Sequence, residues 1–157
     1  MPHYDLLIIG AGSGNSIIDE RHDDWNIAII EPGDFGGTCL NRGCVPSKMF
    51  IHTADRAYMA QQNAPFGIKT KFISADWEKI RDRVFNRIDP ITESGLNYRI
   101  SLPNVTVYRS PGRFIDEKTI LVDDDVITAE QIVIAAGARP SVPDVSGISE
   151  VPYLTSD

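Results

Sequence analysis

One stretch decides the fold of this chain: residues 4–15, which read YDLLIIGAGSGN. The apolar, partly β-branched run from Tyr4 to Ile9 predicts a short buried strand, because it ends abruptly at glycines. A helix is expected from about Ser13 to Arg21 and a second strand from Asn26 to Ile30, which leads into Glu31. A strand, a glycine-rich turn, a helix and a second strand within ~30 residues predict the opening of a dinucleotide-binding unit.

The glycines of this turn have separate expected roles. Gly10 allows a tight turn, and Gly12 lets the backbone approach a pyrophosphate at the N-terminus of the helix. Glu31 stands where the acceptor for a ribose hydroxyl belongs. The third glycine of the fingerprint should fall at position 15, where this chain has Asn15. That glycine usually permits close helix–strand packing, so we expect Asn15 to disturb packing more than phosphate contact. A plain glycine-rich turn without a ligand is the alternative.

The only two cysteines lie in a second glycine-rich stretch, residues 36–48, which reads GGTCLNRGCVPSK. Four residues separate Cys39 from Cys44, and Lys48 follows Cys44 by about one helical turn. Two cysteines this close can form a disulfide if the backbone bends back on itself. We predict an electron-carrying dithiol. The alternatives are two inert thiols, or a zinc site, for which none of the three histidines has a recognised spacing.

Helices are expected in the middle of the chain. One runs from about Cys39 to Gln62, and a second, amphipathic one runs from about Asp76 to Ile100, capped by Ser74 or Asp76. A proline inside each stretch predicts an irregular turn or a bend. Between the helices, residues 61–71 are expected to form a loop.

Strands are expected in the last third of the chain. Four are short, and a longer buried strand ends in a turn before a tail, residues 141–157, without clear elements. The short strands are Val105–Arg109, Arg113–Asp116, Thr119–Val122 and Val126–Thr128, and the buried strand with its turn is Gln131–Gly137. The acidic triplet at 123–125 is interpreted as a solvated hairpin tip.

Composition narrows the class of protein. The chain has 157 residues, 42% of them hydrophobic and 24% charged, which is typical of a globular domain. A net charge of −7 argues against nucleic-acid binding, since no basic patch is available. No apolar run approaches the ~18 residues of a membrane span, and the N-terminus has no signal-peptide pattern. We therefore expect a cytoplasmic protein, in which a close cysteine pair indicates redox or metal chemistry.

Three motifs, in this order along the chain, resemble those of the pyridine-nucleotide disulfide oxidoreductases. They are the Gly10–Glu31 fingerprint, the Gly36–Lys48 stretch and the Ile134–Pro140 turn. The resemblance implies an α/β, Rossmann-like FAD/NAD(P)-binding fold with a parallel central sheet, a long redox helix, an inserted helical pair and a small antiparallel β-meander. Residues 1–157 are expected to be the N-terminal part of the FAD-binding domain, with the nicotinamide-binding and dimer-interface domains outside this chain. Asn15 resembles the pattern of one subgroup of the family.

The resemblance also assigns residues to the cofactor. Ser13 and Gly14 resemble pyrophosphate contacts, Lys48 resembles a lysine beside the reactive flavin nitrogen, and Gly112 resembles a backbone contact to adenine. Ala136 stands where the family more often has Thr, so only backbone contacts carry over there. The full FAD-binding set implied is Gly10, Gly12, Ser13, Gly14, Glu31, Gly37, Thr38, Cys39, Lys48, Gly112, Ala136 and Gly137.

The implied mechanism passes electrons from NADPH, whose site lies outside this chain, through FAD to a Cys39–Cys44 disulfide. By resemblance Cys44 stays beside the flavin, while Cys39 attacks a small-molecule disulfide through a mixed disulfide. A helix start is expected to lower the thiol pKa, and Lys48 adds positive charge near the flavin. The family works as a homodimer whose partner subunit supplies a catalytic histidine, so we expect this chain to be inactive alone.

Two alternatives remain open at the level of sequence. The chain could belong to another disulfide reductase of the same family, because flavin-binding motifs do not specify the disulfide substrate or the choice between NADPH and NADH. It could also be a flavin-binding or thiol-sensing module without catalysis. Neither alternative involves a nucleic acid or a membrane.

Overall fold

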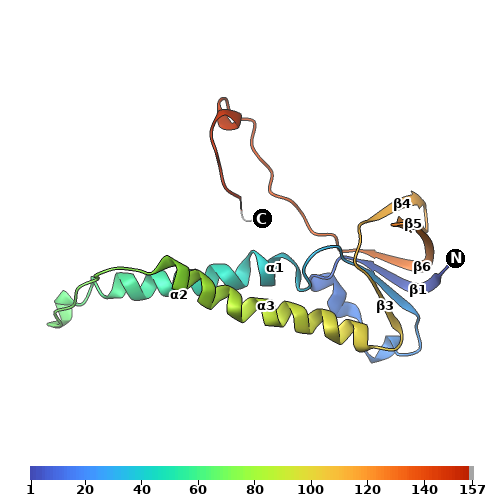
Figure 1. Ribbon diagram of the computed structural model, residues 1–157, viewed down its shortest axis with the longest axis horizontal. Coiled ribbons are helices and arrows are strands. Elements are labelled where there is room, and N and C mark those ends of the chain that lie inside the picture. The colour runs from blue at the N-terminus through green and yellow to red at the C-terminus, as the bar shows by residue number, and fades with distance from the viewer. Residues whose placement is uncertain (156–157) are drawn as a thin grey trace.

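Residues 1–155 are described by a computed structural model, in which one six-stranded sheet organises the chain (Figure 1). The strands lie in the order β3-β2-β1-β6-β5-β4. Their bounds are β1 His3–Ile9, β2 Ile27–Ile30, β3 Val105–Tyr108, β4 Gly112–Asp116, β5 Thr119–Val122 and β6 Asp125–Ile134. Strands β3, β2, β1 and β6 run parallel, while β6, β5 and β4 form an antiparallel meander. The predicted α/β fold with a parallel centre and a small meander is therefore confirmed.

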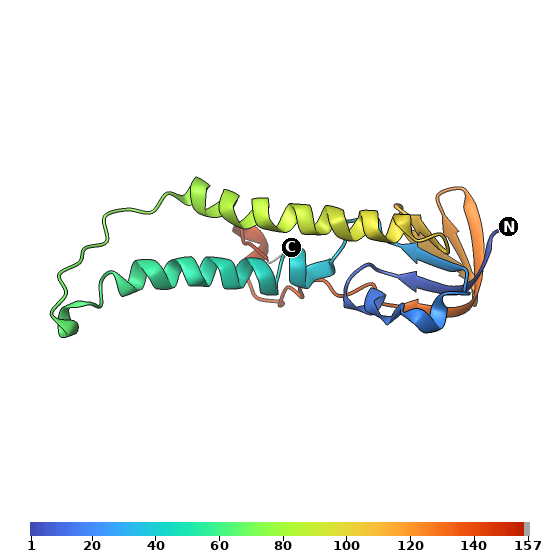
Figure 2. The same ribbon diagram turned by 90° about the horizontal axis from the view of Figure 1, so that it is seen from below.

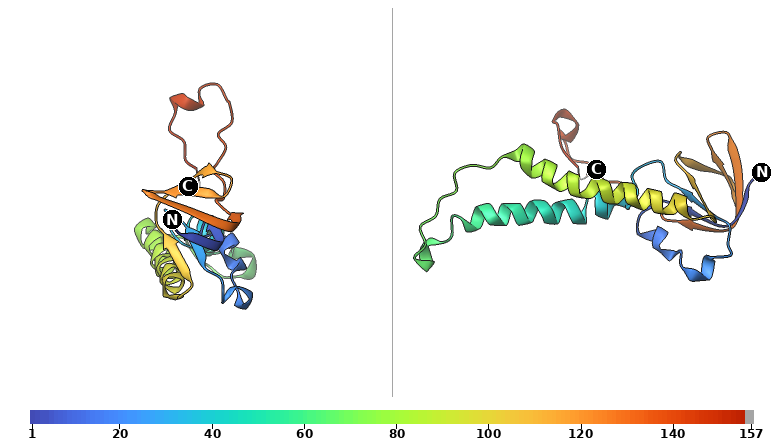
Figure 3. Two further views of the ribbon diagram at one scale, coloured as in Figure 1. Left: turned by 90° about the vertical axis from the view of Figure 1, so that its right-hand side faces the viewer. Right: turned by 60° about the horizontal axis from the view of Figure 1, so that its bottom comes forward.

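Strands β1 and β2, at the centre of the parallel part, are covered on both faces, which explains their continuous apolar sequence. All four residues of β2 are buried. One face, with Leu6 and Ile8 of β1, packs toward the helices, and the other face, with Leu7, packs on the meander. Figure 3 shows the meander and α3 (Trp77–Ser101) on opposite sides of these strands. The core therefore lies in two layers around β1 and β2.

The helix expected from Ser13 to Arg21 is replaced by two short 3₁₀ turns, η1 Ser13–Ile17 and η2 Glu20–His22. Ile18 between them has extended backbone, with φ −71° and ψ 117°. Asp19 then starts the second turn, because its carboxylate accepts the backbone N–H of Arg21 at 3.1 Å and binds the Arg21 guanidinium. The predicted regular helix is therefore wrong, because the side-chain contacts of Asp19 compete with helical hydrogen bonds.

The predicted helix from Cys39 to Gln62 is also divided, into α1 Gly37–Asn41 and α2 Cys44–Met59. The break falls at Gly43, whose backbone is not helical (φ −124°, ψ −108°). Pro46 lies in the first turn of α2, where a backbone N–H has no partner to lose. The second predicted helix is confirmed as α3, which begins after Asp76 and continues through Pro90.

Helices α2 and α3 lie side by side and extend away from the sheet as an arm (Figure 2). Phe50 of α2 stacks on Trp77 of α3, with ring centroids 5.4 Å apart, and Arg83 donates to the Thr53 hydroxyl at 2.7 Å. The loop that joins them contains one 3₁₀ turn, η3 Ala64–Phe66. The redox helix of the prediction is thus itself one member of the helical pair.

Strand β6 differs from its prediction in two ways. The segments expected as separate strands form one strand from Asp125 to Ile134, and its second half is not buried, since Ile134 is 72% exposed. Strand β5 pairs only with residues 125–128, so beyond Thr128 only β1 lies beside β6.

The C-terminal segment then leaves the sheet and carries one 3₁₀ turn, η4 Ile148–Glu150 (Figure 1). The last two residues of the predicted tail lie outside the described residues. No helix within residues 1–155 is long and apolar enough to cross a bilayer.

Candidate functional site

Three small-residue segments converge at the carboxyl ends of β1 and β6. The Gly36 N–H donates to the Ala11 carbonyl at 2.9 Å, and the Ala135 N–H donates to the Ile9 carbonyl at 2.8 Å. At Gly37, which has φ +64°, a Cβ would lie 2.6 Å from the Gly12 Cα. Because that distance is far below a van der Waals contact, only glycine allows the two glycine-rich stretches to touch.

A cavity of about 470 Å³ lies between these segments. Eight of the residues predicted from the sequence line it: Gly12, Ser13, Glu31, Gly37, Thr38, Cys39, Ala136 and Gly137. The structure thus brings together the fingerprint turn, the acidic residue after β2, the first cysteine and the C-terminal turn. A larger cavity, of about 750 Å³, lies against α3 and contains none of the predicted residues.

Five predicted residues do not line the small cavity. Gly10 lies beneath it, where a Cβ would meet the Ala135 carbonyl oxygen at 2.2 Å, and Cys44 and Lys48 lie on the exposed first turns of α2. Gly112 lies in β4, where a Cβ would come within 2.9 Å of Ile30 Cδ1. The structure therefore explains Gly112 by packing, and its adenine contact stays a prediction.

Gly14, the fifth, makes a close contact with the residue that follows β6. A Cβ on Gly14 would lie 2.3 Å from the Ala135 Cβ, so this glycine provides the close approach to the strand that the fingerprint normally assigns to its third glycine. Asn15 itself is buried, with 9% of its surface exposed. The close contact at this turn is thus made by Gly14 with Ala135, directly after β6, and the expected effect of Asn15 on packing stays a prediction.

The Glu31 carboxylate is fixed by two backbone donors. Its Oε2 accepts the N–H of Ala11 at 2.9 Å, and its Oε1 accepts the N–H of Gly33 at 2.8 Å. These bonds join the end of β2 to the glycine-rich turn and leave lone pairs on both oxygens for a further donor. An acceptor therefore points at the cavity from a defined position.

The two cysteines come together across the short break between α1, which ends at Asn41, and α2, which begins at Cys44. The Arg42 N–H donates to the Thr38 carbonyl at 2.9 Å, and a Cβ on Gly43 would lie 3.0 Å from that same oxygen. Both cysteines are free and exposed, and the Cys44 side chain lies near enough to Cys39 to affect the ionisation of its thiol. The predicted pairing of Cys39 with Cys44 is therefore compatible with the geometry.

The ionisation of Cys39 differs from its prediction. The hydrogen bond with the Cys44 side chain raises the pKa of the Cys39 thiol above its usual value. The expectation that a helix start lowers the thiol pKa is wrong at Cys39, because α1 has only five residues and a second thiol lies beside it. Within residues 1–155, no cluster of three or more His, Cys, Asp or Glu could hold a metal ion.

Sequence reasoning missed Asn41, which lies between the cysteines. Its Nδ2 donates to the Phe35 carbonyl at 3.0 Å, and its Oδ1 accepts the Thr92 hydroxyl of α3 at 2.6 Å. Asn41 thereby ties the dithiol loop to both the glycine-rich stretch and the arm. Arg42 and Arg139 also line the cavity and were not predicted. Their positions inside or beside the motifs were the only available signal.

The family model for pyridine nucleotide-disulphide oxidoreductases matches residues 4–157. The chain belongs to this family. Across its whole length it is 47% identical to the mycothione reductase of Mycobacterium tuberculosis strain H37Rv, and over 98% of its length it is 36% identical to the mercuric reductase of Staphylococcus aureus. Among solved structures, it matches the Cu(II) complex of the HOCl-induced flavoprotein disulfide reductase RclA from Escherichia coli, with a TM-score of 0.71, 26% identity and 94% of this chain covered.

These relatives are much longer than the chain. It spans 36% of the mycothione reductase, 28% of the mercuric reductase and 31% of the RclA chain. The matches show a mixed α/β fold like that of flavoprotein disulfide reductases, and the close Cys39–Cys44 pair fits the redox disulfide of that family.

Proposed function

We propose that this chain is the FAD-binding part of an NADPH-dependent disulfide reductase that acts on mycothiol disulfide. The observation that carries the proposal is the position of Cys39, which lines the glycine-walled cavity and at the same time contacts Cys44. A dithiol beside a glycine-walled cavity needs an electron donor, and a flavin in that cavity is the simplest one. A cytoplasmic location suits a dithiol that must be reduced in each cycle.

The residues present fit FAD. Gly12 and Gly37 form a wall without side chains, which lets backbone groups approach a pyrophosphate closely. The held carboxylate of Glu31 suits a ribose hydroxyl. Lys48 on α2 provides positive charge one turn beyond Cys44. When bound, FAD would accept a hydride and pass on two electrons.

The dithiol performs the second half of the reaction. The Cys39 thiolate attacks one sulfur of the substrate disulfide, the substrate S–S bond breaks, and the first product leaves as a thiol after taking a proton. The Cys44 sulfur then attacks Cys39 in the mixed disulfide and releases the second product thiol. Two electrons have passed to the substrate, and the pair is left as a disulfide.

The remaining functions are proposed to lie outside this chain. NADPH binding belongs to a nicotinamide domain, and the acid–base histidine belongs to a partner subunit in a homodimer. The choice of mycothiol disulfide is supported by the 47% identity to a mycothione reductase over the whole chain. Preference of the longer enzyme for glutathione disulfide or lipoamide would overturn this substrate and favour a glutathione reductase or a dihydrolipoyl dehydrogenase.

The decisive test for this chain is its visible spectrum. The purified protein is mixed with FAD, separated from unbound FAD and titrated with dithionite. We expect stoichiometric flavin and, after two electrons, a long-wavelength absorbance band from a thiolate beside the flavin. Cys44→Ser should remove the band while FAD stays bound. The matched Cys39→Ser has no disulfide to reduce, so it should show the band before any dithionite is added and lose it when the flavin is reduced. A protein that does not retain FAD contradicts the proposal, and a band that survives Cys44→Ser reverses the roles of the cysteines.

A further inference from the structure

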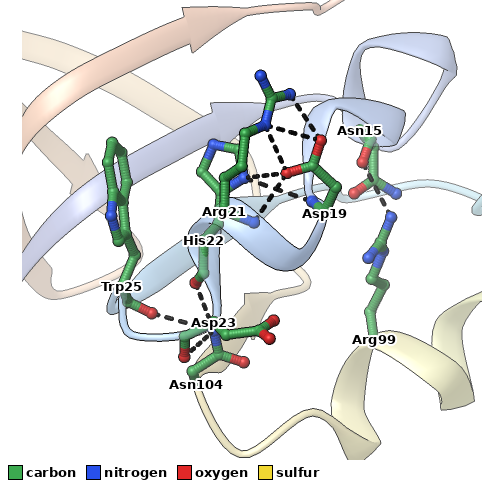
Figure 4. Close-up of polar contacts among 8 residues, drawn as sticks. All are labelled: Asn15, Asp19, Arg21, His22, Asp23, Trp25, Arg99 and Asn104. Atoms are coloured by element: carbon green, nitrogen blue, oxygen red, sulfur yellow. Dashed lines mark hydrogen bonds and ion pairs between the residues drawn. The ribbon is translucent and has the colours of Figure 1, made fainter.

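Arg99, in the last turn of α3, reaches the glycine-rich turn from a distant part of the chain. Its Nη2 donates to the backbone carbonyl of Asn15 at 2.9 Å, across 84 positions of sequence (Figure 4). In a regular α-helix that carbonyl would accept the N–H of Asp19. Here the Asp19 N–H is directed instead at Nδ1 of His22, at 3.3 Å. A side chain from α3 thus takes the place of a helical hydrogen bond.

Asn15 connects this contact to the proposed phosphate site. Its own N–H donates to the Gly12 carbonyl at 3.1 Å, so the backbone of Asn15 is bonded to Arg99 through its carbonyl and to Gly12 through its N–H. The Asn15 side chain cannot orient the turn, because its Oδ1 is buried without a hydrogen-bond partner among the described residues. Arg99 therefore supplies the side-chain contact from a distant element that holds the backbone at this position, in addition to the turn's own hydrogen bonds.

The charge of Arg99 is also directed toward this turn. The guanidinium is partly buried, and burial lowers its pKa from the usual value without discharging it at neutral pH. None of the ion pairs formed within residues 1–155 includes Arg99. The neighbouring group of Asp19, Arg21 and His22 is occupied with its own bonds (Figure 4). A positive charge without a carboxylate partner thus lies next to a turn that is suited to an anion.

We propose that Arg99 is a positioning residue for the pyrophosphate of FAD, acting through the Asn15 carbonyl on the Gly12–Asn15 turn. The inference rests on the proposed FAD site. It assigns to α3 a role that the dinucleotide fingerprint normally gives to the helix behind its own glycines, which is here only a 3₁₀ turn. Arg99 acts on the shape of the turn rather than as a direct ligand.

The test compares Arg99→Met with Arg99→Lys and with Arg87→Met, which removes the same charge from an exposed position of the same helix. Affinity for FAD is measured by quenching of flavin fluorescence on the full chain. We expect Arg99→Met to raise the Kd about tenfold, the scale of a lost hydrogen bond from a charged group. Arg99→Lys should recover most of the affinity, and Arg87→Met should bind like the parent.

Competition with ADP and with adenosine separates positioning from a general structural effect. ADP keeps a pyrophosphate, whereas adenosine has no phosphate and keeps the adenine and the ribose that is proposed to bind Glu31. Arg99→Met should raise the Kd for ADP about tenfold and leave the Kd for adenosine unchanged. Equal weakening of both ligands, or an unchanged FAD Kd, overturns the inference.

Two outcomes need a separate decision. If circular dichroism shows that Arg99→Met does not fold, the test rests on Arg99→Lys. A Kd for ADP that is raised about threefold in Arg99→Lys, with an unchanged Kd for adenosine, supports the inference. An unchanged Kd for ADP overturns it. If the parent chain binds no FAD, both the proposed function and the inference are wrong. If the parent binds FAD and Arg99→Met binds it with the same Kd, only the inference is wrong.

Discussion

Single residues set the ionisation of the dithiol. The pKa of Cys39 is raised chiefly by its hydrogen bond with Cys44, so removal of that thiol should lower it. We expect the reduced Cys44→Ala protein to be alkylated at Cys39 by iodoacetamide with a midpoint at lower pH than the reduced parent, measured peptide by peptide with mass spectrometry. Cys44→Ser keeps a hydroxyl and should retain part of the upward shift. A midpoint that rises in Cys44→Ala would contradict the assigned cause.

The contact between the glycine-rich stretches also depends on one residue. In Gly37→Ala, left-handed backbone costs ~1–2 kcal/mol for an L-residue, and the new Cβ would overlap the Gly12 Cα at 2.6 Å. We expect a loss of more than about 2 kcal/mol of unfolding free energy, together with at least tenfold weaker FAD binding. Gly67→Ala is the matched control, since it has φ +71° with nothing within 4 Å of its Cβ. Gly67→Ala should lose only the unfolding free energy that the left-handed backbone costs, and it should bind FAD like the parent. Equal effects on FAD at both positions would argue against the contact.

Among the elements, α3 depends on a single cap. The Asp76 carboxylate accepts the Lys79 N–H at 3.1 Å, and Ser74, the other candidate from the sequence, makes no cap contact. Asp76→Ala should therefore cost about 1 kcal/mol in urea unfolding, while Ser74→Ala should cost almost nothing. The reverse order would mean that the helix starts earlier than the structure shows.

The elements also show what could be predicted from the sequence. The strands around Gly10 and the position of Glu31 follow a local pattern, and the cysteine stretch is a continuous motif, so the cavity could be outlined in advance. The break at Gly43 and the loss of the helix after Ser13 could not be predicted, because competing local contacts decide them. Gly14 against Ala135 and Asn41 against Thr92 are contacts between distant segments, which no local pattern encodes.

At the scale of the whole molecule, a pair of tyrosines joins β1 to β3 across β2. The hydroxyls of Tyr4 and Tyr108 lie 2.8 Å apart on the face covered by the meander. Burial, followed by this hydrogen bond, raises the pKa of Tyr108 far above its usual value. In the unfolded chain a tyrosine ionises near pH ~10. The pair therefore contributes its full stability below that pH and loses it as the pH rises toward the pKa of the folded state.

Tyr108→Phe tests this link between strands. At neutral pH it should cost about 1 kcal/mol, the net value of one hydrogen bond. Above pH ~10, where the parent loses stability as Tyr108 ionises in the unfolded chain, the difference should shrink, because phenylalanine has no proton to lose. Tyr58→Phe, at an exposed position of α2, removes a hydroxyl without burial and should follow the parent at every pH. Urea unfolding at a series of pH values measures all three proteins. A cost in Tyr108→Phe that grows with pH would mean that the tyrosine is charged in the folded protein, and that β1 and β3 are joined by another contact.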